Sequence, residues 1–243
     1  MDIDALRRAA TAEVACRKYK DGRESAITDD VAREVSVAVT CENGPSRALW
    51  AAPIDLETLA LGHAVLEWGR DFGRPVLVSR QGNAFTLRFE AEAPAPREEG
   101  AALPGPVRRE DVLTLMRTFI REDGLWDGTG CFHRAAAADL TTLSFVARAE
   151  DIGRHNCMDR LAGWALNNGA RLSGHALFLS ARVTASMLQK AMAAGFAVIV
   201  SRSAVTTATV ELARAAGICL AGFCRENENR FTIFSDPKER IVG

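Results

Sequence analysis

The chain lacks the common signatures of nucleotide and metal sites. No Walker A run and no G-x-G-x-x-G stretch occurs in its 243 residues, which excludes a P-loop and an ordinary dinucleotide fold. Its six cysteines lie far apart without a C-x-x-C pair. The sequence therefore indicates neither a disulfide framework nor a zinc ribbon, and we expect reduced thiols.

Excess charge of one sign and long apolar runs are also missing. Thirty basic and thirty-one acidic side chains give a net charge of -1, which argues against a general binder of nucleic acid or anionic membranes. Met1–Tyr19 has no apolar core of signal-peptide length, and no run approaches transmembrane length. We expect a cytoplasmic protein with no nucleic-acid or membrane partner, in which any anion site is local.

The hydrophobic pattern of the first hundred residues predicts a small α+β module. Residues 1–30 have no clear period and are expected to form a loosely packed leader. Apolar residues alternate over 35–39, which predicts a strand, and recur at helical spacing over 56–68. Residues 76–78 and 85–89 are typical of two strands joined by a hairpin.

A linker is expected at 91–106, because this segment has four prolines and two glycines and, apart from one leucine, no large apolar residue. We place the domain boundary there. Residues 1–105 are then an N-terminal α+β module with its linker, and residues 106–243 a C-terminal α/β domain.

Beyond the linker, the sequence alternates regularly between helical and strand patterns. An amphipathic helix is predicted at 108–121. It is followed by strands at 142–149, 175–180, 196–201 and 218–223, and by helices at 157–168, 184–194 and 206–216. This order predicts a parallel sheet covered by helices.

An arginine follows each of the four predicted strands. If the strands are parallel, their carboxyl ends share one edge of the sheet, where ligands bind in such folds. Arginine forks suit phosphate oxygens, and helix N-termini attract anions. The four residues are Arg154, Arg182, Arg202 and Arg225. We therefore expect a phosphate-bearing small molecule, such as a nucleotide, at this edge.

The stretch from Glu150 to Leu161 is the most polar of these strand-to-helix turns. Gly153 permits a tight turn and Asn156 can cap the following helix, which leaves Arg154 and His155 to face the crevice. The alternative is a solvated turn with surface ion pairs.

A second candidate is the C-x-H pair Cys131 and His133, which precedes an alanine run. In a strand both side chains would face the same way, so the imidazole could favour the thiolate. The pair could handle sulfur, or hold a metal together with His155 and Cys157. Alternatively, Cys131 is an inert packing residue.

These segments resemble the FdhD family, the accessory proteins of molybdenum- or tungsten-dependent formate dehydrogenases. The resemblance covers roughly residues 108–235. It rests on T-G-C-F-H at 129–133, E-D-I-G-R-H-N at 150–156 with D-R-L at 159–161, S-A-R at 180–182 with Q-K-A at 189–191, residues 201–212, and G-F-C-R at 222–225.

The resemblance implies a cytidine-deaminase-like, three-layer α/β fold for the C-terminal domain, and a homodimer. It also implies binding of molybdopterin guanine dinucleotide with molybdenum or tungsten, or of GDP as its fragment, with a cysteine desulfurase and the formate dehydrogenase apoprotein as partners. The deaminase zinc signatures are missing, so no deaminase activity and no metal ligand is expected. Cofactor binding is expected at His133, Arg154, His155, Asn156, Ser180, Arg182, Ser201, Thr206, Phe223, Cys224, Arg225, Glu226, Asn227 and Glu228.

One departure from the family bears on sulfur transfer. The family carries sulfur on a C-x-x-C loop before the helix at Arg108, whereas residues 91–107 contain no cysteine. Cofactor sulfuration or insertion is therefore expected without the family's sulfur-carrying loop, and Cys131 is the candidate substitute. The alternatives are a guanine-nucleotide-binding regulatory module without catalysis, and a thiol enzyme that acts on a nucleotide through Cys131.

Overall fold

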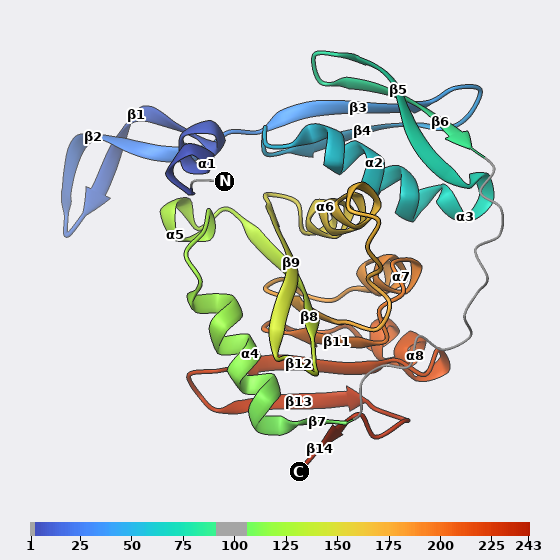
Figure 1. Ribbon diagram of the computed structural model, residues 1–243. Helices are drawn as coiled ribbons and strands as arrows, with labels where there is room; N and C mark the ends of the chain where they lie inside the picture. Colours follow the sequence, from blue (N-terminus) through green and yellow to red (C-terminus); the bar gives the residue numbers. More distant parts are fainter. Residues whose placement is uncertain (1–2, 91–105) are drawn as a thin grey trace.

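The computed structural model describes residues 3–90 and 106–243, which form two main β-sheets with helices packed against them (Figure 1). The smaller sheet has the strand order β4-β3-β6-β5. Its elements are β3 (Val35–Cys41), β4 (Ser46–Ala51), α2 (Leu56–Glu67), α3 (Gly69–Phe72), β5 (Arg74–Gln81) and β6 (Ala84–Glu90). Helix α2 packs on this sheet. The strands, helix and hairpin predicted for the small module are confirmed.

The larger sheet has six strands in the order β13-β12-β11-β10-β8-β9. They are β8 (His133–Asp139), β9 (Ser144–Asp151), β10 (Ala176–Leu179), β11 (Val198–Ser201), β12 (Cys219–Arg225) and β13 (Arg230–Ser235). Strands β10, β11 and β12 are parallel, whereas β8 runs antiparallel to β10 and β9, and β13 antiparallel to β12. The predicted all-parallel sheet is therefore wrong, because the sheet is mixed.

Two strands of the larger sheet were not predicted, β13 and the alanine run in β8. Four consecutive alanines give neither a large apolar side chain nor an alternating pattern. In the fold they alternate between two cores: Ala135 and Ala137 face one cluster, Ala136 and Ala138 the other. Small side chains allow helices to approach both faces of this strand, which lies between β10 and β9. Because β8 opposes both of its neighbours, β9 points the same way as β10.

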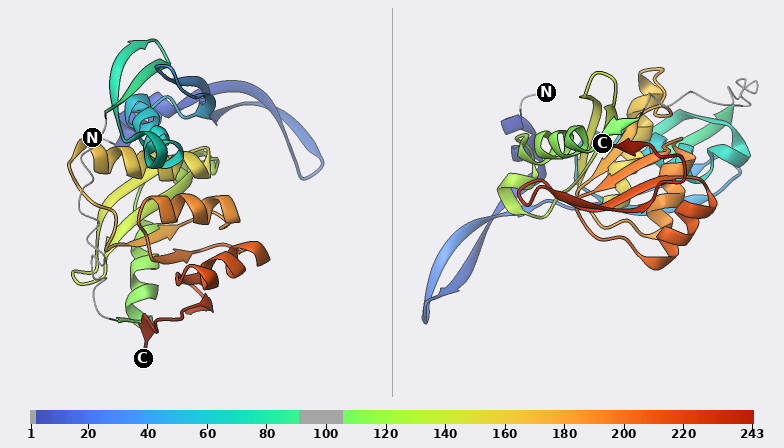
Figure 2. Two further views of the ribbon diagram at one scale, coloured as in Figure 1. Left: turned by 90° about the vertical axis from the view of Figure 1, so that its right-hand side faces the viewer. Right: turned by 90° about the horizontal axis from the view of Figure 1, so that it is seen from below.

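Helices cover both faces of the larger sheet, which gives three layers (Figure 2). Helix α4 (Arg109–Arg121) lies on one face, and α6 (Arg154–Asn167), α7 (Ala185–Ala193) and α8 (Thr207–Ala215) lie on the other. The predicted helices are confirmed, but α6 begins at residue 154 rather than 157. The remaining short elements are α5 (Trp126–Thr129), β7 (Val107–Arg108) and β14 (Ile241–Val242). No helix among the described residues has the length and apolar character needed to cross a membrane.

Helices α2 and α6 join the two sheets by an unusually close contact. A Cβ atom added to Gly62 would lie 1.7 Å from the carbonyl oxygen of Asp159, and one added to Gly163 would lie 1.9 Å from that of Thr58. Only glycine permits this approach. The predicted linker lies almost wholly within residues 91–105, outside the described residues, so the domain boundary stays a prediction.

The N-terminal segment, expected to be a loosely packed leader, has regular secondary structure. Helix α1 (Ile3–Ala10) leads into a hairpin of β1 (Thr11–Lys20) and β2 (Arg23–Ala32) that projects from the body (Figures 1 and 2). The turn is Asp21-Gly22, and both residues have positive φ, at 52° and 78°. Asp-Gly favours such hairpin turns. The hairpin gives no alternating apolar pattern because both of its faces are largely exposed.

Candidate functional site

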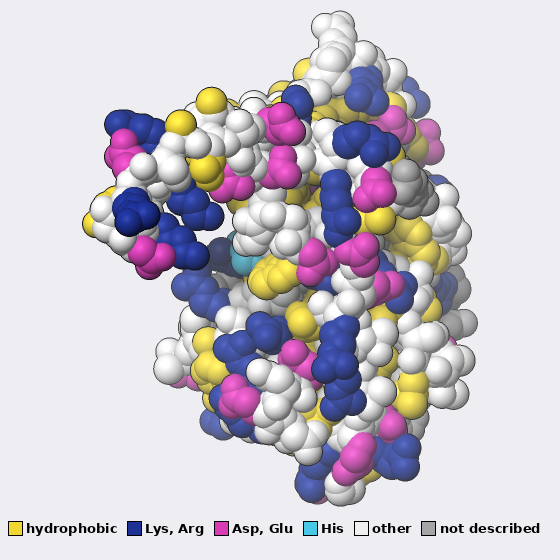
Figure 3. All heavy atoms as spheres, turned by 90° about the vertical axis from the view of Figure 1, so that its left-hand side faces the viewer, with side chains coloured by type: hydrophobic (Ala, Val, Ile, Leu, Met, Phe, Trp, Pro, Cys, Tyr) yellow, Lys and Arg dark blue, Asp and Glu magenta, His cyan; other side chains and the backbone are white. Residues whose placement is uncertain are grey.

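The carboxyl ends of β9, β10, β11 and β12 meet the start of β8 along one edge of the larger sheet. On the side of the molecule shown in Figure 3, the surface is hollowed below the β1–β2 hairpin. Lys and Arg side chains border this hollow, and a histidine is visible inside it. We define the strand-end recess by Cys131, His133, Arg154 and Arg182, which lie at this edge. The prediction that the strand ends share one edge is confirmed, although β8 interrupts the order.

The recess contains polar atoms that are buried but unused. Within the described part of the chain, His133 Nδ1 and Arg154 Nε are buried without a hydrogen-bond partner. The pKa of His133 is lowered from 6.5, first by burial and then by the positive charges of Arg154 and Arg182. A buried donor or acceptor without a partner costs about 1–3 kcal/mol. An anionic, hydrogen-bonding ligand would relieve both the missing partners and the positive charge.

His155 lies in the first turn of α6, next to Arg154, and its Nε2 is 3.1 Å from Ser186 Oγ on α7. Burial lowers its pKa, and the charges of Lys190 and Arg154 lower it further, while Asp159 and Glu67 act in the opposite direction. His155 is therefore positioned beside the recess as a mainly neutral imidazole.

Four predicted ligand residues instead support the backbone around the recess. Asn156 donates to the carbonyl of Trp50 at 2.7 Å and to Asp151 Oδ1 at 2.9 Å. The Ser180 hydroxyl accepts from the Arg134 backbone N–H at 2.9 Å, and that of Ser201 donates to the Ala181 carbonyl at 2.7 Å. Thr206 caps α8 by accepting from the backbone N–H of Thr209. These side chains shape the strand ends.

The predicted residues at the end of β12 differ in their roles. Phe223 is half-buried at a positive φ of 49°, which is uncommon for an aromatic residue, and its ring centroid lies 6.2 Å from that of Phe234. Cys224 is fully buried. Arg225 is half-buried, and Asn227 is exposed in the turn that follows.

Two acids near this turn have arginine partners. Glu226 accepts from Arg202 Nε at 3.4 Å, and Glu228 pairs with Arg230. Arg202, which was expected to face a ligand, therefore already has a carboxylate neighbour.

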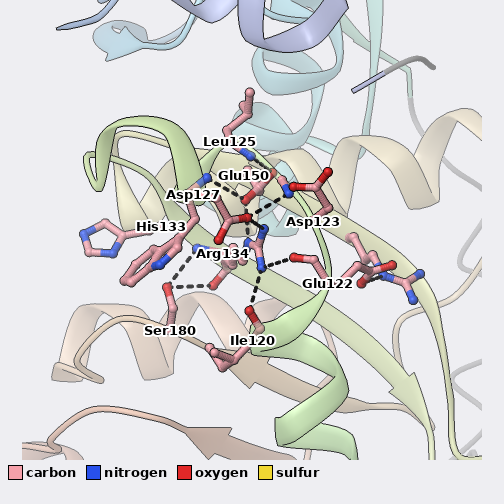
Figure 4. Close-up of polar contacts among 12 residues, drawn as sticks. Ile120, Glu122, Asp123, Leu125, Asp127, His133, Arg134, Glu150 and Ser180 are labelled. Atoms are coloured by element: carbon pink, nitrogen blue, oxygen red, sulfur yellow. Dashed lines mark hydrogen bonds and ion pairs between the residues drawn. The ribbon is translucent and has the colours of Figure 1, made fainter. Parts of the chain in front are cut away.

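The carboxylates that end β9 turn inward rather than toward the strand-end recess. Glu150 pairs with Arg134 and accepts from the backbone N–H of Leu125 at 2.9 Å (Figure 4). Arg134 also donates to carbonyls at the C-terminal end of α4 and to that of Glu122, whereas His133 points away from this network (Figure 4). Residues 133 and 134 face opposite sides because side chains alternate along a strand.

The last carboxylate of β9, Asp151, is fully buried. It binds Arg160 at 2.7 Å and accepts from the backbone N–H of Gly153. Arg160 in turn donates to the carbonyls of Ala52 and Asp55, in the loop before α2. The pair therefore ties the turn that carries Arg154 to the smaller sheet.

A second buried network joins α2, α6 and α7. Lys190 Nζ lies 2.7 Å from Asp159 Oδ1 and 3.1 Å from Glu67 Oε1, and His63 Nδ1 lies 3.2 Å from Asp159 Oδ2. No role was predicted for these residues from the sequence. The sequence contains two signals that could have indicated this network: Gly62 next to His63, and the adjacent acid and base at 159–160.

The thiols divide into two groups. Cys131 is exposed at the mouth of the recess, just before β8. Cys157 is fully buried and donates to the carbonyl of His133 at 3.3 Å. Its thiol therefore belongs to the core, which disfavours the metal pair considered with Cys131.

A cavity also lies beside the paired residues that end β9. A cavity of about 410 Å³ is lined by Leu6, Ile54, Trp164 and the paired residues Glu150 and Arg160. Its charged groups already have partners. The strand-end recess, with its unused polar atoms, is the better candidate for a ligand.

Fold and site together describe a mixed α/β protein with a cationic site at the ends of its strands. The chain belongs to the FdhD/NarQ family, because that family's model matches residues 78–242. A relative from Cupriavidus necator, "Sulfur carrier protein FdhD", is 32% identical, over 92% of this chain and 88% of the relative. A relative of the same description from Staphylococcus aureus is 25% identical, over 93% and 94% of the two chains.

A solved structure has the same fold. It is the crystal structure of a protein from Desulfotalea psychrophila, described as a proposed formate dehydrogenase accessory protein. The match has a TM-score of 0.78 and covers 96% of this chain and 100% of that one, at 19% identity. The resemblance seen in the sequence is confirmed at the level of family and fold.

Proposed function

We propose that this protein is a formate dehydrogenase accessory protein that binds molybdopterin guanine dinucleotide, or GDP as its fragment, in the strand-end recess. The observation that carries the proposal is the pair of buried, unpartnered atoms, His133 Nδ1 and Arg154 Nε. Both lie in a site where the charges of Arg154 and Arg182 act on the imidazole. Diphosphate is an anion with several acceptor oxygens, so it matches this donor set.

The residues of the recess fit the phosphates of such a cofactor. Arg154 and Arg182 would hold phosphate oxygens, with the first turn of α6 providing free backbone N–H groups. His133 would donate or accept at the floor of the recess. When bound, the cofactor would supply the molybdenum or tungsten centre to which sulfur is added. Glu226 and Glu228 follow Arg225 and would repel a phosphate. Each has an arginine partner, so this repulsion is weaker than that of two unpaired carboxylates.

Sulfur handling enters the proposal through the relatives, which are described as sulfur carrier proteins. We propose that Cys131 takes the place of the missing C-x-x-C loop, because it is exposed and precedes His133 by two residues. The partners would be a cysteine desulfurase as donor and a formate dehydrogenase apoprotein as recipient.

We also propose that the protein is a homodimer. Light scattering at micromolar concentration tests this, and a strictly monomeric mass would contradict it.

Calorimetry with GDP tests the proposed site. We expect GDP to bind, and Arg182→Ala to weaken binding about tenfold or more, since a charge-assisted contact contributes about 1.5–3 kcal/mol. Arg108→Ala is the matched control, because Arg108 is exposed near α4 and pairs only with Asp111 among the contacts described for it. The proposal is wrong if millimolar GDP gives neither heat nor a thermal shift. GDP binding without any effect on formate dehydrogenase would favour a regulatory nucleotide-binding module.

A further inference from the structure

The β1–β2 hairpin, residues 11–32, has free sheet edges. It is a sheet of two strands only, so each strand has one edge whose backbone N–H and C=O groups lie outside the ladder. The hairpin projects from the body (Figures 1 and 2). Strand β2 contacts α5, and Ala32 at its end packs in one cluster with Leu125 and Phe132. The outer edge of β1 is therefore the more open of the two.

Strand β1 lacks two devices that commonly protect an edge strand, short length and proline. It has ten residues without proline or glycine, and it is exposed from Glu13 to Lys20. Its centre, Val14-Ala15-Cys16, is uncharged. A long exposed edge of this kind pairs readily with another chain. An isolated two-stranded hairpin is also only marginally stable in water, and additional strands stabilise it. The edge of β1 is therefore suited to accept another strand.

The hairpin is acidic near its base and basic at its tip. The strand register places Glu13 opposite Asp30, next to Asp29, whereas Lys20 is opposite Arg23 at the turn. Like charges directly opposite each other on a sheet are destabilising. A cation brought to the base, or an anion brought to the tip, would relieve this repulsion.

A second copy of the hairpin supplies both charges at once. If two copies lie antiparallel, the basic tip of each is next to the acidic base of the other, so their potentials are complementary. A parallel arrangement would instead bring like charges together. A purely acidic partner would repel the base, and a purely basic partner would repel the tip. The charge pattern therefore fits a second copy of this chain better than a partner of one sign.

We propose that two copies of the protein associate by antiparallel pairing of β1 with β1, which joins the hairpins into one sheet in the order β2-β1-β1-β2. The inference rests on the proposed homodimer and identifies the surface through which it forms. The charges also select the register. With Ala15 of both copies on the two-fold axis, Glu13 is opposite Arg17 of the partner subunit. The two side chains share a face, because side chains alternate along a strand.

Light scattering over a concentration series tests the charges of this interface. Glu13→Arg and Arg17→Glu each convert both ion pairs of the symmetric interface into repulsions, so we expect either variant to raise the dimer dissociation constant about tenfold or more. An equimolar mixture of the two variants should dimerise again, because each copy then meets the opposite charge. Arg80→Glu is the matched control, since this exposed residue of β5 undergoes the same change of charge outside the hairpin.

Disulfide crosslinking tests the register. In a Cys16→Ser background, Ala15→Cys places two thiols directly opposite each other at the two-fold axis, at a spacing close to that of a disulfide. We expect mild oxidation to give a covalent dimer on a non-reducing gel. The matched control is Thr28→Cys in the same background. Thr28 is opposite Ala15 on β2, on the same face but away from the paired edge, so we expect no additional crosslink.

Three outcomes would overturn the β1 interface. A wild-type dimer that neither charge reversal weakens rejects this surface but leaves the homodimer. Two monomeric variants that do not associate when mixed, or equal crosslinking at positions 15 and 28, reject the register and with it the pairing of β1. A strictly monomeric wild type rejects the homodimer itself. GDP calorimetry on the same variants tests the cofactor site separately, because the substitutions lie on the hairpin and not in the strand-end recess.

Discussion

The short stretch from residue 150 to residue 160 contributes charged side chains to two very different environments. Glu150, Asp151 and Asp159 turn inward, where each has a basic partner. Arg154 turns toward the strand-end recess, where its Nε has no hydrogen-bond partner among the described residues. A buried charge needs a partner of opposite sign, because an unpaired buried charge destabilises the fold. Unused polar groups beside an open recess instead indicate a place for a ligand.

The inward set should dominate stability. Asp159→Ala leaves Lys190 and His63 without their buried carboxylate, and we expect the free energy of unfolding to fall by about 3–5 kcal/mol. Arg17→Ala is the control, because Arg17 and Glu24 form an exposed pair, which contributes less than about 1 kcal/mol. Urea denaturation measures both variants. If both variants lost the same free energy of unfolding, the inward set would stabilise the protein no more than an exposed ion pair.

The recess set should dominate ligand binding. Arg154→Ala should weaken GDP binding by about 1.5–3 kcal/mol, because the guanidinium has no competing acceptor at Nε. Arg202→Ala should weaken it less, since Arg202 already faces Glu226 at 3.4 Å. Calorimetry compares the two variants, with unfolding curves to confirm their stability. If Arg202→Ala weakened GDP binding more than Arg154→Ala, the ligand would instead bind nearer to β12 on the same sheet edge.

The glycine contact at the junction should be sensitive to a single methyl group. Gly163→Ala places a Cβ atom against the Thr58 carbonyl, so we expect a loss of stability of about 1–3 kcal/mol from overpacking. Gly128→Ala should be neutral or slightly stabilising, because its added Cβ meets nothing within 4 Å. Thermal melts of both variants distinguish a tight junction from a loose one.

The smallest expected effect is a pH dependence. The folded-state pKa of His133 lies below its ordinary value of 6.5, because burial and two arginines disfavour the imidazolium. As the pH falls below about 6.5, the unfolded chain therefore binds the proton first, and the free energy of unfolding decreases by at most about 1.4 kcal/mol per pH unit per histidine. This contribution is present above pH 6.5 and is lost below it.

Urea denaturation as a function of pH measures this slope. His133→Asn should flatten it, and so should saturating GDP, because a nearby phosphate favours the charged imidazole. An unchanged slope in both cases would show that the pH dependence comes from other groups.

The helical and strand periods were sufficient to predict most elements. The helix over 56–68 and the alternation after residue 142 appear in the fold close to their predicted bounds. Several elements were missed, β4 and β13 among them, and for two of the omissions the physical reason is clear. The alanines of β8 become a strand only because helices pack on both faces of it, and the β1–β2 hairpin has no buried face to produce an alternating pattern. The Asp21-Gly22 turn was the one local signal available for this hairpin.

The site was predicted as a set of residues, and tertiary structure divided that set. Arginine and histidine after several strands pointed to one edge, and the family resemblance assigned a cofactor to it. Sequence could not distinguish Asn156, Ser180 and Ser201, which bind backbone or neighbouring side chains, from Arg154, whose Nε is buried without a hydrogen-bond partner among the described residues. Whether a polar side chain finds a partner depends on residues distant in the chain.

The sequence by itself determined the family, the periods of its helices and strands, and the absence of the C-x-x-C loop, because these depend only on residue order. Tertiary structure decided which charges are paired and which thiols are accessible. The carbonyls that fix Arg160 come from the loop before α2, and Cys16 is exposed because the β1–β2 hairpin leaves the body beside Phe132. Both outcomes follow from contacts between segments far apart in the chain, which a local pattern does not encode.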